Sequence, residues 1–217
     1  MIQHLIWDVD GTLFDTYPAI ARSFQAGLHD LGAEAAYDEV LRLALVSLDH
    51  CLATLSATYA LSSDDLEERF AQHYQTFTPE DQPPFAGVKE VCAYIRARGG
   101  LNLIVTHRQR AGLDRLLAAH HLTADFAGII SHDDAFPRKP DPAAFVHLIE
   151  KHRLPRQTVL GLGDRDIDMQ AAQAAGIRAA FFGVNDGAAT PDFTYRDYTQ
   201  LLRYLAEEQL QPAPAEL

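Results

Sequence analysis

The stretch WDVDGTLFDT, residues 7–16, follows a short and mostly apolar segment at the beginning of the chain. It places two carboxylates, Asp8 and Asp10, where a buried strand is expected to end. Paired acids at the edge of a hydrophobic core either form a turn and cap the next element, or hold a cation and take part in chemistry. Which of the two applies depends on what the rest of the chain brings to the same place.

Apolar segments of strand length recur along the chain and alternate with segments of helical spacing. The expected strands are residues 4–7, 101–106, 127–131, 158–163 and 177–183, and the expected helices between them are residues 88–99, 110–121, 142–152 and 169–176. Near-continuous apolar strands separated by helices are typical of a parallel sheet covered on both faces. The pattern predicts an α/β fold with a doubly wound, Rossmann-like parallel sheet.

A helical insertion interrupts this alternation. Three helical patterns follow one another at residues 17–31, 37–59 and 63–77, the third beginning at Ser63 with two acids at the positive end of the helix dipole. We therefore expect an α/β core formed by residues 1–16 and 81–217, with an all-helical domain of residues 17–80 inserted after the first strand. The tail, residues 211–217, is expected to be frayed.

The composition limits the classes of partner. Of 217 residues, 47% are hydrophobic and 22% charged, and the net charge is −12 without a lysine or arginine run. This disfavours nonspecific binding to nucleic acid or to an anionic membrane, but leaves a small anionic substrate open because a metal and a few local cations can outweigh the global charge. Cys51 and Cys92 lie far apart in apolar helical segments. We expect them to be buried free thiols of a protein in a reducing cytoplasm, not a disulfide or a zinc site. With no basic leader and no apolar stretch near the ~18 residues of a membrane span, a cytoplasmic protein is expected.

The expected strand ends carry polar residues of complementary chemistry. Ligands of an open parallel sheet bind at the carboxyl ends of its strands. Taken singly, each residue has a structural explanation: a turn acid, a strand threonine, a solvated lysine or an acid at a helix N-terminus. Their joint order favours one shared site, made of Asp8 and Asp10, then Thr106, then Lys139, and finally Asp164 and Asp168.

Such a site suits phosphoryl transfer. Asp8 and Asp164 offer the hard oxygen ligands that Mg²⁺ prefers, and a metal there would offset the repulsion between a carboxylate and a phosphate. Asp8 could attack phosphorus to form an aspartyl-phosphate. Asp10, expected to point the same way because alternate strand residues share a face, would protonate the leaving oxygen and later deprotonate water. Thr106 would hold phosphoryl oxygens and Lys139 would neutralise charge.

Other motifs fail on spacing. DVDGTLFD, from Asp8, and DRDIDMQA, from Asp164, look like calcium-binding loops, but they have Leu13 and Met169 at the sixth position, where a glycine is needed. GLGDRD begins like a dinucleotide-binding fingerprint, but Asp166 stands in place of its third glycine. Neither a GxxxxGK[ST] loop nor a GxSxG elbow occurs.

The set of acids, threonine and lysine at the expected strand ends resembles that of the haloacid dehalogenase-like (HAD) hydrolase superfamily. The resemblance rests on DVDGTLFDT, the strand-terminal Thr106, Lys139 in RKPDP, and GDRDID. The helical insertion looks like the helical cap of the phosphoglycolate-phosphatase-like branch. The resemblance implies a Mg²⁺-dependent phosphatase that hydrolyses a small phosphomonoester metabolite through an aspartyl-phosphate.

The resemblance also implies roles for single residues. Asp8 matches the nucleophile and a metal ligand, and Asp10 matches the acid/base residue, whose backbone carbonyl also binds the metal. Asp164 matches a metal ligand, while Asp168 is expected to orient Lys139 or a metal-bound water. The phosphate-binding candidates are Thr106, His107 and Lys139. Arg108 is expected to form a surface salt bridge or to contact a substrate anion.

Departures from the family pattern leave alternatives open. Mutases of this branch carry a histidine where this chain has Ile20, so a phosphotransferase of the β-phosphoglucomutase type is the weaker alternative. The presence of Asp10 favours phosphoryl transfer over carbon–halogen cleavage. A non-catalytic phosphate-binding regulatory protein is the remaining alternative. A monomer or small homo-oligomer is expected, and the candidates to contact the substrate from the helical insertion are Arg22, Arg42, His50 and Arg69.

Overall fold

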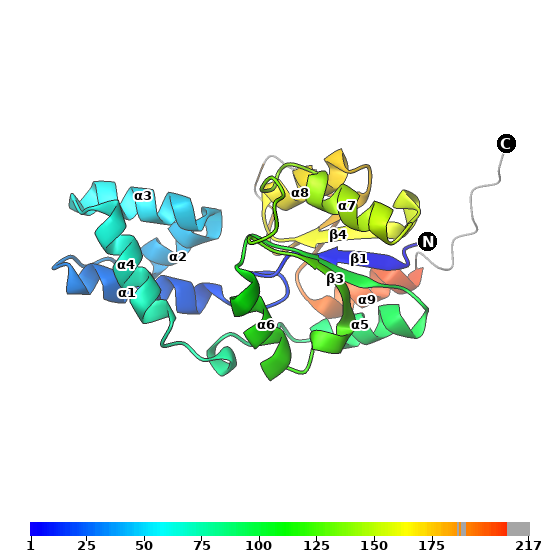
Figure 1. The fold of residues 1–217 in the computed structure, drawn as a ribbon, viewed down its shortest axis with the longest axis horizontal. Helices are drawn as coiled ribbons and strands as arrows, with labels where there is room; N and C mark the ends of the chain where they lie inside the picture. The colour runs from blue at the N-terminus through cyan, green and yellow to red at the C-terminus, as the bar shows by residue number, and fades with distance from the viewer. Residues whose placement is uncertain (186, 188–189, 208–217) are drawn as a thin grey trace. The chain divides into compact units, whose positions relative to one another are not determined.

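A computed structural model describes residues 1–185, 187 and 190–207. The chain divides into two compact units, one formed by residues 1–14 and 84–217 and the other by Asp15–Pro83 (Figure 1). The second unit includes the whole segment 17–80 that was expected as a helical insertion. The expected frayed tail lies outside the described residues.

The first unit is built around a parallel sheet. Its strands, in the order β3-β2-β1-β4-β5-β6, are β1 (His4–Trp7), β2 (Asn102–Val105), β3 (Phe126–Ile130), β4 (Val159–Gly163), β5 (Arg178–Phe182) and β6 (Phe193–Tyr195). All neighbouring strands pair in parallel. The chain moves outward from β1 to β3 and then returns to β4 on the other side of β1, so the direction of winding reverses beside β1. The doubly wound fold predicted from the sequence is confirmed.

Helices cover both faces of this sheet (Figure 1). They are α5 (Val88–Ala97), α6 (Arg110–Ala119), α7 (Ala143–Lys151), α8 (Asp166–Ala174) and α9 (Tyr198–Glu207), with short 3₁₀ turns at Thr123–Asp125 and Arg156–Thr158. Along β1, Leu5 and Trp7 pack in the core under α5, α6 and α9, while Ile6 packs in the core under α7 and α8. Successive side chains of β1 therefore point to opposite faces of the sheet, and both faces are buried.

The second unit is helical and has its own core. It contains α1 (Tyr17–Asp30), α2 (Tyr37–Val46), α3 (Leu48–Tyr59), α4 (Ser63–Tyr74) and a 3₁₀ turn at Pro79–Asp81. The rings of Phe24 and Phe70 stack with centroids 4.2 Å apart in this core. The segment 37–59 is two helices instead of one, because Ser47 is extended and its side chain accepts the His50 N–H as the cap of α3.

Some boundaries differ from the sequence-based expectations. Helix α8 begins at Asp166 instead of residue 169, and Ser62, not Ser63, caps α4 by accepting the Asp65 N–H. Strand β6 was not expected, because a three-residue strand carries almost no periodicity. Helix α9, Tyr198–Glu207, was not expected either. Over the part of the chain that is described, the helices all fall short of the length and hydropathy needed to cross a bilayer.

Gly161 lets β4 and α8 approach closely. A Cβ atom on Gly161 would lie 2.7 Å from the Cβ of Ala172. We predict that Gly161→Ala lowers the free energy of unfolding by about 1–3 kcal/mol, because this part of the core has no room for a methyl group.

The double variant Gly161→Ala with Ala172→Gly supplies the control. The second substitution removes the facing methyl, and although glycine costs about 1 kcal/mol in a helix, part of the lost stability should return. Urea denaturation measures the four species of this cycle. Strictly additive losses would contradict the proposed contact.

Candidate active site

The candidate site begins where β1 ends at the reversal of the sheet. The Asp8 N–H donates to the Leu162 carbonyl at 2.9 Å, which continues the β1–β4 pairing by one residue. The chain then turns at Gly11, whose φ of +78° suits glycine, and the Gly11 N–H donates to the Phe14 carbonyl at 2.9 Å. The loop after β1 is therefore tied back on itself beside the point where ligands bind in this fold class.

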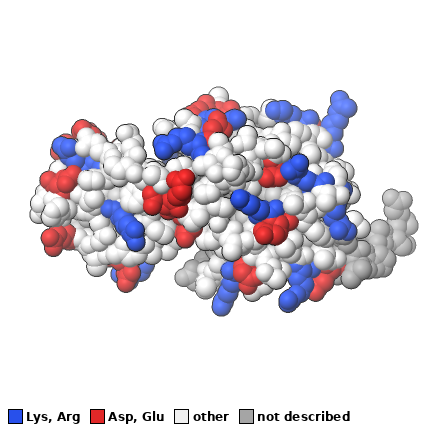
Figure 2. Space-filling view, turned by 90° about the horizontal axis from the view of Figure 1, so that it is seen from below, with Lys and Arg blue, Asp and Glu red and all other residues white. Residues whose placement is uncertain are grey.

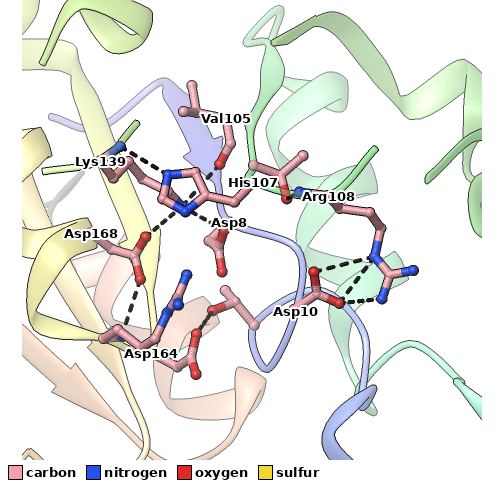
Figure 3. A network of polar contacts seen from close by, with 11 residues as sticks. Asp8, Asp10, Val105, His107, Arg108, Lys139, Asp164 and Asp168 are labelled. Carbon is pink, nitrogen blue, oxygen red and sulfur yellow. Dashed lines mark hydrogen bonds and ion pairs between the residues drawn. The ribbon is translucent and has the colours of Figure 1, made fainter. Parts of the chain in front are cut away.

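Lys139 links three segments of the site (Figure 3). Its Nζ donates to Asp8 Oδ1 at 2.5 Å, to Asp168 Oδ1 at 2.5 Å and to the Val105 carbonyl at 3.2 Å. The side chains of Lys139, Asp8 and Asp168 are 1–3% exposed. An ammonium group has three N–H donors, so these three acceptors satisfy it fully.

Burial and charge act in opposite directions on these groups. For Lys139, burial lowers the pKa, but the charges of Asp168 and Asp8 outweigh it and the pKa is raised. For Asp168, burial disfavours ionisation, yet Lys139 and Arg165 hold the pKa below its usual value. For Asp8, burial together with the charge of Asp168 raises the pKa to about 6 against the opposing effect of Lys139. Of the two carboxylates, Asp8 is therefore the one whose charged form is less favoured by the chain itself.

Asp164 reaches the cluster from the loop after β4 and is supported from the far end of the chain. Its Oδ1 accepts the Thr12 hydroxyl at 3.0 Å, and the Thr12 carbonyl accepts the Tyr198 hydroxyl from α9. A ladder of hydrogen bonds thus connects α9 through the β1 loop to Asp164.

Gly163 allows Asp168 to approach the sheet. A Cβ atom on Gly163 would lie 2.2 Å from the Cβ of Asp168, a separation that side chains cannot reach. The second oxygen of Asp168, Oδ2, accepts a hydrogen bond from the backbone N–H of Arg165 at 3.1 Å. Both of its oxygens are therefore engaged by the chain itself.

The carboxylates of Asp8, Asp164 and Asp168 fit a hard divalent cation. One oxygen of each lies within 4.8 Å of the others. Asp8 Oδ2 is buried and has no hydrogen-bond partner among the described residues, an arrangement that is costly for a carboxylate oxygen. Because Asp168 is held by Lys139 and Arg165, the donor set points to Asp8 and Asp164 as the carboxylates best suited to hold a metal.

Asp10 and Asp8 have different neighbours. Nε of Arg108 donates to both oxygens of Asp10 at 3.0 and 3.2 Å, and its Nη2 also donates to Oδ1. Figure 3 shows Asp10 turned toward Arg108, whereas Asp8 lies toward Lys139 and Asp168. The strand-based reason for expecting Asp8 and Asp10 to point alike does not apply, because β1 ends at Trp7.

Thr106 and His107 lie directly after β2, beside Asp8. The Thr106 Oγ1 accepts the Arg108 N–H at 3.1 Å, which leaves its hydroxyl proton to donate elsewhere. His107 Nε2 accepts the Lys139 N–H at 2.9 Å and so fixes the backbone of the lysine. Burial, aided by the charges of Lys139 and Arg138, lowers the pKa of His107 to about 3, so the ring stays neutral and keeps this acceptor.

The structure brings the residues predicted at the strand ends into one neighbourhood, and it adds two, Thr12 and Tyr198, that sequence reasoning missed. Thr12 was quoted within the first motif without a role, and Tyr198 lies in a helix that was not expected. Arg108 was expected to form a surface salt bridge or to contact a substrate anion; it does form a salt bridge, to Asp10, but its side chain is only 11% exposed.

Comparisons with known proteins agree with this arrangement. The model of the haloacid dehalogenase-like hydrolase family matches residues 5–182. The chain belongs to this family. It is 30% identical to the phosphoglycolate phosphatase of Aliivibrio fischeri, over 94% of this chain and 97% of that protein. It is 33% identical to the phosphoglycolate phosphatase of Mesorhizobium japonicum, over 84% of each chain.

A solved structure agrees with the fold. A haloacid dehalogenase-like protein from Agrobacterium tumefaciens matches with a TM-score of 0.80 and 20% identity, over 96% of this chain and all of that one. The family expected from the motifs, its phosphoglycolate-phosphatase-like branch and its class of enzyme, a phosphoric monoester hydrolase, are confirmed by these matches.

Lys139→Met tests the central ion pair of this HAD hydrolase. The variant leaves Asp8 and Asp168 buried without their cation, and we predict a loss of about 3–5 kcal/mol in the free energy of unfolding. Urea denaturation measures the loss, and Lys89→Met at an exposed position of α5 is the matched control.

The loss should depend on pH. Without the lysine, the folded state favours protonated carboxylates and binds more protons than the unfolded chain, so stability rises as the pH falls. The penalty is therefore expected to be smaller in mildly acidic than in alkaline buffer. A Lys139→Met midpoint equal to that of Lys89→Met would contradict the assignment.

Proposed function

We propose that this HAD hydrolase is a Mg²⁺-dependent phosphatase of a small phosphomonoester metabolite and that it acts through an aspartyl-phosphate on Asp8. The observation that carries the proposal is the asymmetry of the Asp8 carboxylate. Lys139 donates a hydrogen bond to Oδ1, while the buried Oδ2 has no hydrogen-bond partner among the described residues. The lone pairs of Oδ2 can therefore bind a metal or attack a phosphorus atom. Asp8 and Asp164 would hold the metal, together with the backbone carbonyl of Asp10.

A bound Mg²⁺ would supply positive charge that offsets the repulsion between the carboxylate and the phosphate. In the first step, an oxygen of Asp8 forms a bond to phosphorus as the bond from phosphorus to the leaving oxygen breaks. Asp10 gives its proton to that oxygen and later takes one from the water that attacks phosphorus. The bond between Asp8 and phosphorus then breaks, and phosphate leaves.

The cations of the site support an anionic substrate despite the net charge of −12. Lys139 and the Thr106 hydroxyl would bind phosphoryl oxygens, and His107 would act by keeping the lysine backbone in place. On the face shown in Figure 2, lysine and arginine side chains are interspersed with acids instead of gathered in one patch. Such a surface suits a small ligand better than a polyanion.

The helical unit, Asp15–Pro83, is proposed to act as a cap that selects the substrate. Ile20 supports hydrolysis over transfer to a sugar. It is 4% exposed within the apolar core of that unit, where its side chain offers no group for proton transfer.

Asp8→Asn tests the nucleophile. With p-nitrophenyl phosphate and Mg²⁺, we predict a fall in the rate of phosphate release of roughly 1,000-fold or more, because the amide is a poor nucleophile and a weaker metal ligand. The matched control is Asp64→Asn, which makes the same change at an exposed position of α4.

Metal dependence is tested in the same assay. Chelation should stop phosphate release and added Mg²⁺ should restore it, and Asp164→Asn should raise the Mg²⁺ concentration needed for half-maximal rate. Full activity of Asp8→Asn, or of the chelated enzyme, would overturn the proposal.

A further inference from the structure

Tyr198, the first residue of α9, is held in place by three other elements. Its ring stacks on Trp7 of β1 with the centroids 5.8 Å apart, and it lies 5.1 Å from the ring of Phe182 in β5. Directly before α5, a Cβ atom on Gly87 would lie 2.7 Å from the Tyr198 Cβ, so the backbone of α5 approaches Tyr198 as only a glycine allows. Tyr198 is 1% exposed, and its ring therefore has little freedom to move.

The hydroxyl of Tyr198 is a permanent donor to the loop after β1. It donates to the carbonyl of Thr12, a group that can only accept. Burial, aided by the neighbouring Tyr195, holds the pKa of Tyr198 well above its usual value, so the hydroxyl keeps its proton. Thr12 is 0% exposed, so bulk water does not compete for this hydrogen bond.

The peptide backbone at Thr12 depends on this hydrogen bond. The N–H groups of Leu13 and Phe14 both donate to the Val9 carbonyl at 2.9 Å. The Thr12 N–H donates to the same carbonyl at 3.3 Å. A carbonyl oxygen has two lone pairs, so three donors exceed its capacity and the long bond from Thr12 is the weakest of them. The tyrosine hydroxyl supplies the stronger anchor, at the other end of the same residue.

Thr12 passes this constraint to a candidate metal ligand. Its hydroxyl donates to Asp164 Oδ1 at 3.0 Å. A residue that donates to a metal-binding carboxylate orients that carboxylate, and its removal typically weakens metal binding by about 10- to 100-fold. The position of the Thr12 hydroxyl therefore determines how Asp164 presents its carboxylate.

We propose that Tyr198 is a positioning residue of the metal site, which acts through Thr12 to hold the Asp164 carboxylate in the orientation that binds Mg²⁺. The inference rests on the metal dependence of the proposed function. It makes the affinity for Mg²⁺ depend on a helix 186 residues beyond the loop that it supports. Because such coupling is reciprocal, bound Mg²⁺ should in turn stabilise the docked position of α9.

Packing alone accounts less well for Tyr198. A phenylalanine would stack on Trp7 and Phe182 equally well, and a buried hydroxyl is costly unless it is hydrogen-bonded. The hydroxyl is directed at a loop residue whose own hydroxyl reaches Asp164. The feature that distinguishes tyrosine from phenylalanine here is therefore its connection to the site.

Binding of Mg²⁺ to the substrate-free chain tests the proposal. Isothermal titration calorimetry measures the Kd of Mg²⁺ for the wild-type chain, Tyr198→Phe, Thr12→Val and the double variant, with Asp164→Asn to show that the heat comes from this site. Urea midpoints without Mg²⁺ record stability separately. The matched control is Tyr204→Phe in the same helix, where the hydroxyl accepts a hydrogen bond from Arg178 at 3.2 Å.

We expect Thr12→Val to raise the Kd by about tenfold or more, and Thr12→Ser, which keeps the hydroxyl, to stay near wild type. Tyr198→Phe should raise the Kd by about threefold to tenfold, the effect of one hydrogen bond. The double variant should match Thr12→Val alone, because Tyr198 acts through Thr12. Tyr204→Phe should keep the wild-type Kd even if its urea midpoint falls.

Other results overturn the inference. A wild-type Kd in Tyr198→Phe would show that the hydroxyl serves stability alone. A double variant whose loss is the product of the two single losses would show that Tyr198 acts independently of Thr12. If Tyr198→Phe does not fold, hydrogen exchange of α9 replaces it: Mg²⁺ should slow exchange in the wild-type chain but not in Thr12→Val, and equal exchange in the wild-type chain with and without Mg²⁺ would contradict the coupling.

The failure of this inference can be told from that of the proposed function. A wild-type Kd in Tyr198→Phe, together with Mg²⁺-dependent phosphate release by the wild-type chain, sinks the inference alone. A wild-type chain that binds no Mg²⁺ sinks both the inference and the metal dependence on which it rests.

Discussion

The arrangement of the candidate site depends on one buried ammonium group. Lys139 is bonded to Asp8, which lies 131 residues earlier, and to Asp168, which lies 29 residues later. A buried ion pair contributes little net stability compared with a well-packed apolar core, but losing one partner is costly because the other charge stays buried. Its effect is therefore positional: the loops after β1, β3 and β4 must meet for any of the three charges to be tolerated.

Further constraints pass from this cluster into the fold. The reversal of strand order beside β1 puts Asp8 and Asp164 directly after the ends of two adjacent strands, β1 and β4, and Gly163 lets Asp168 come close enough to accept a hydrogen bond from the lysine. The ladder from Tyr198 through Thr12 connects α9 to Asp164. The scaffold thus leaves one oxygen of Asp8 unpaired among the described residues, which is the preorganisation that the proposed chemistry needs.

The sequence predicted the parts of this arrangement that leave a local or ordered signal. Apolar strands alternating with helices indicated the doubly wound sheet, and the acids, threonine and lysine at successive strand ends indicated a shared site. It could not indicate that Asp10 faces Arg108, since that depends on where β1 ends and on the turn at Gly11. Nor could it indicate the role of Tyr198, because a contact across 186 residues leaves no periodic trace.

The most direct test of the account is whether phosphate passes through the Asp8 carboxylate. The enzyme is mixed with Mg²⁺ and a hydrolysed phosphomonoester, quenched in acid during turnover, digested, and analysed by peptide mass spectrometry. The account predicts a phosphoryl group on the peptide that contains Asp8, absent without Mg²⁺, and solvent oxygen in the released phosphate when the reaction runs in ¹⁸O-labelled water. Rapid turnover with the phosphoryl group on another residue, or with solvent oxygen incorporated into Asp8 instead, would contradict it.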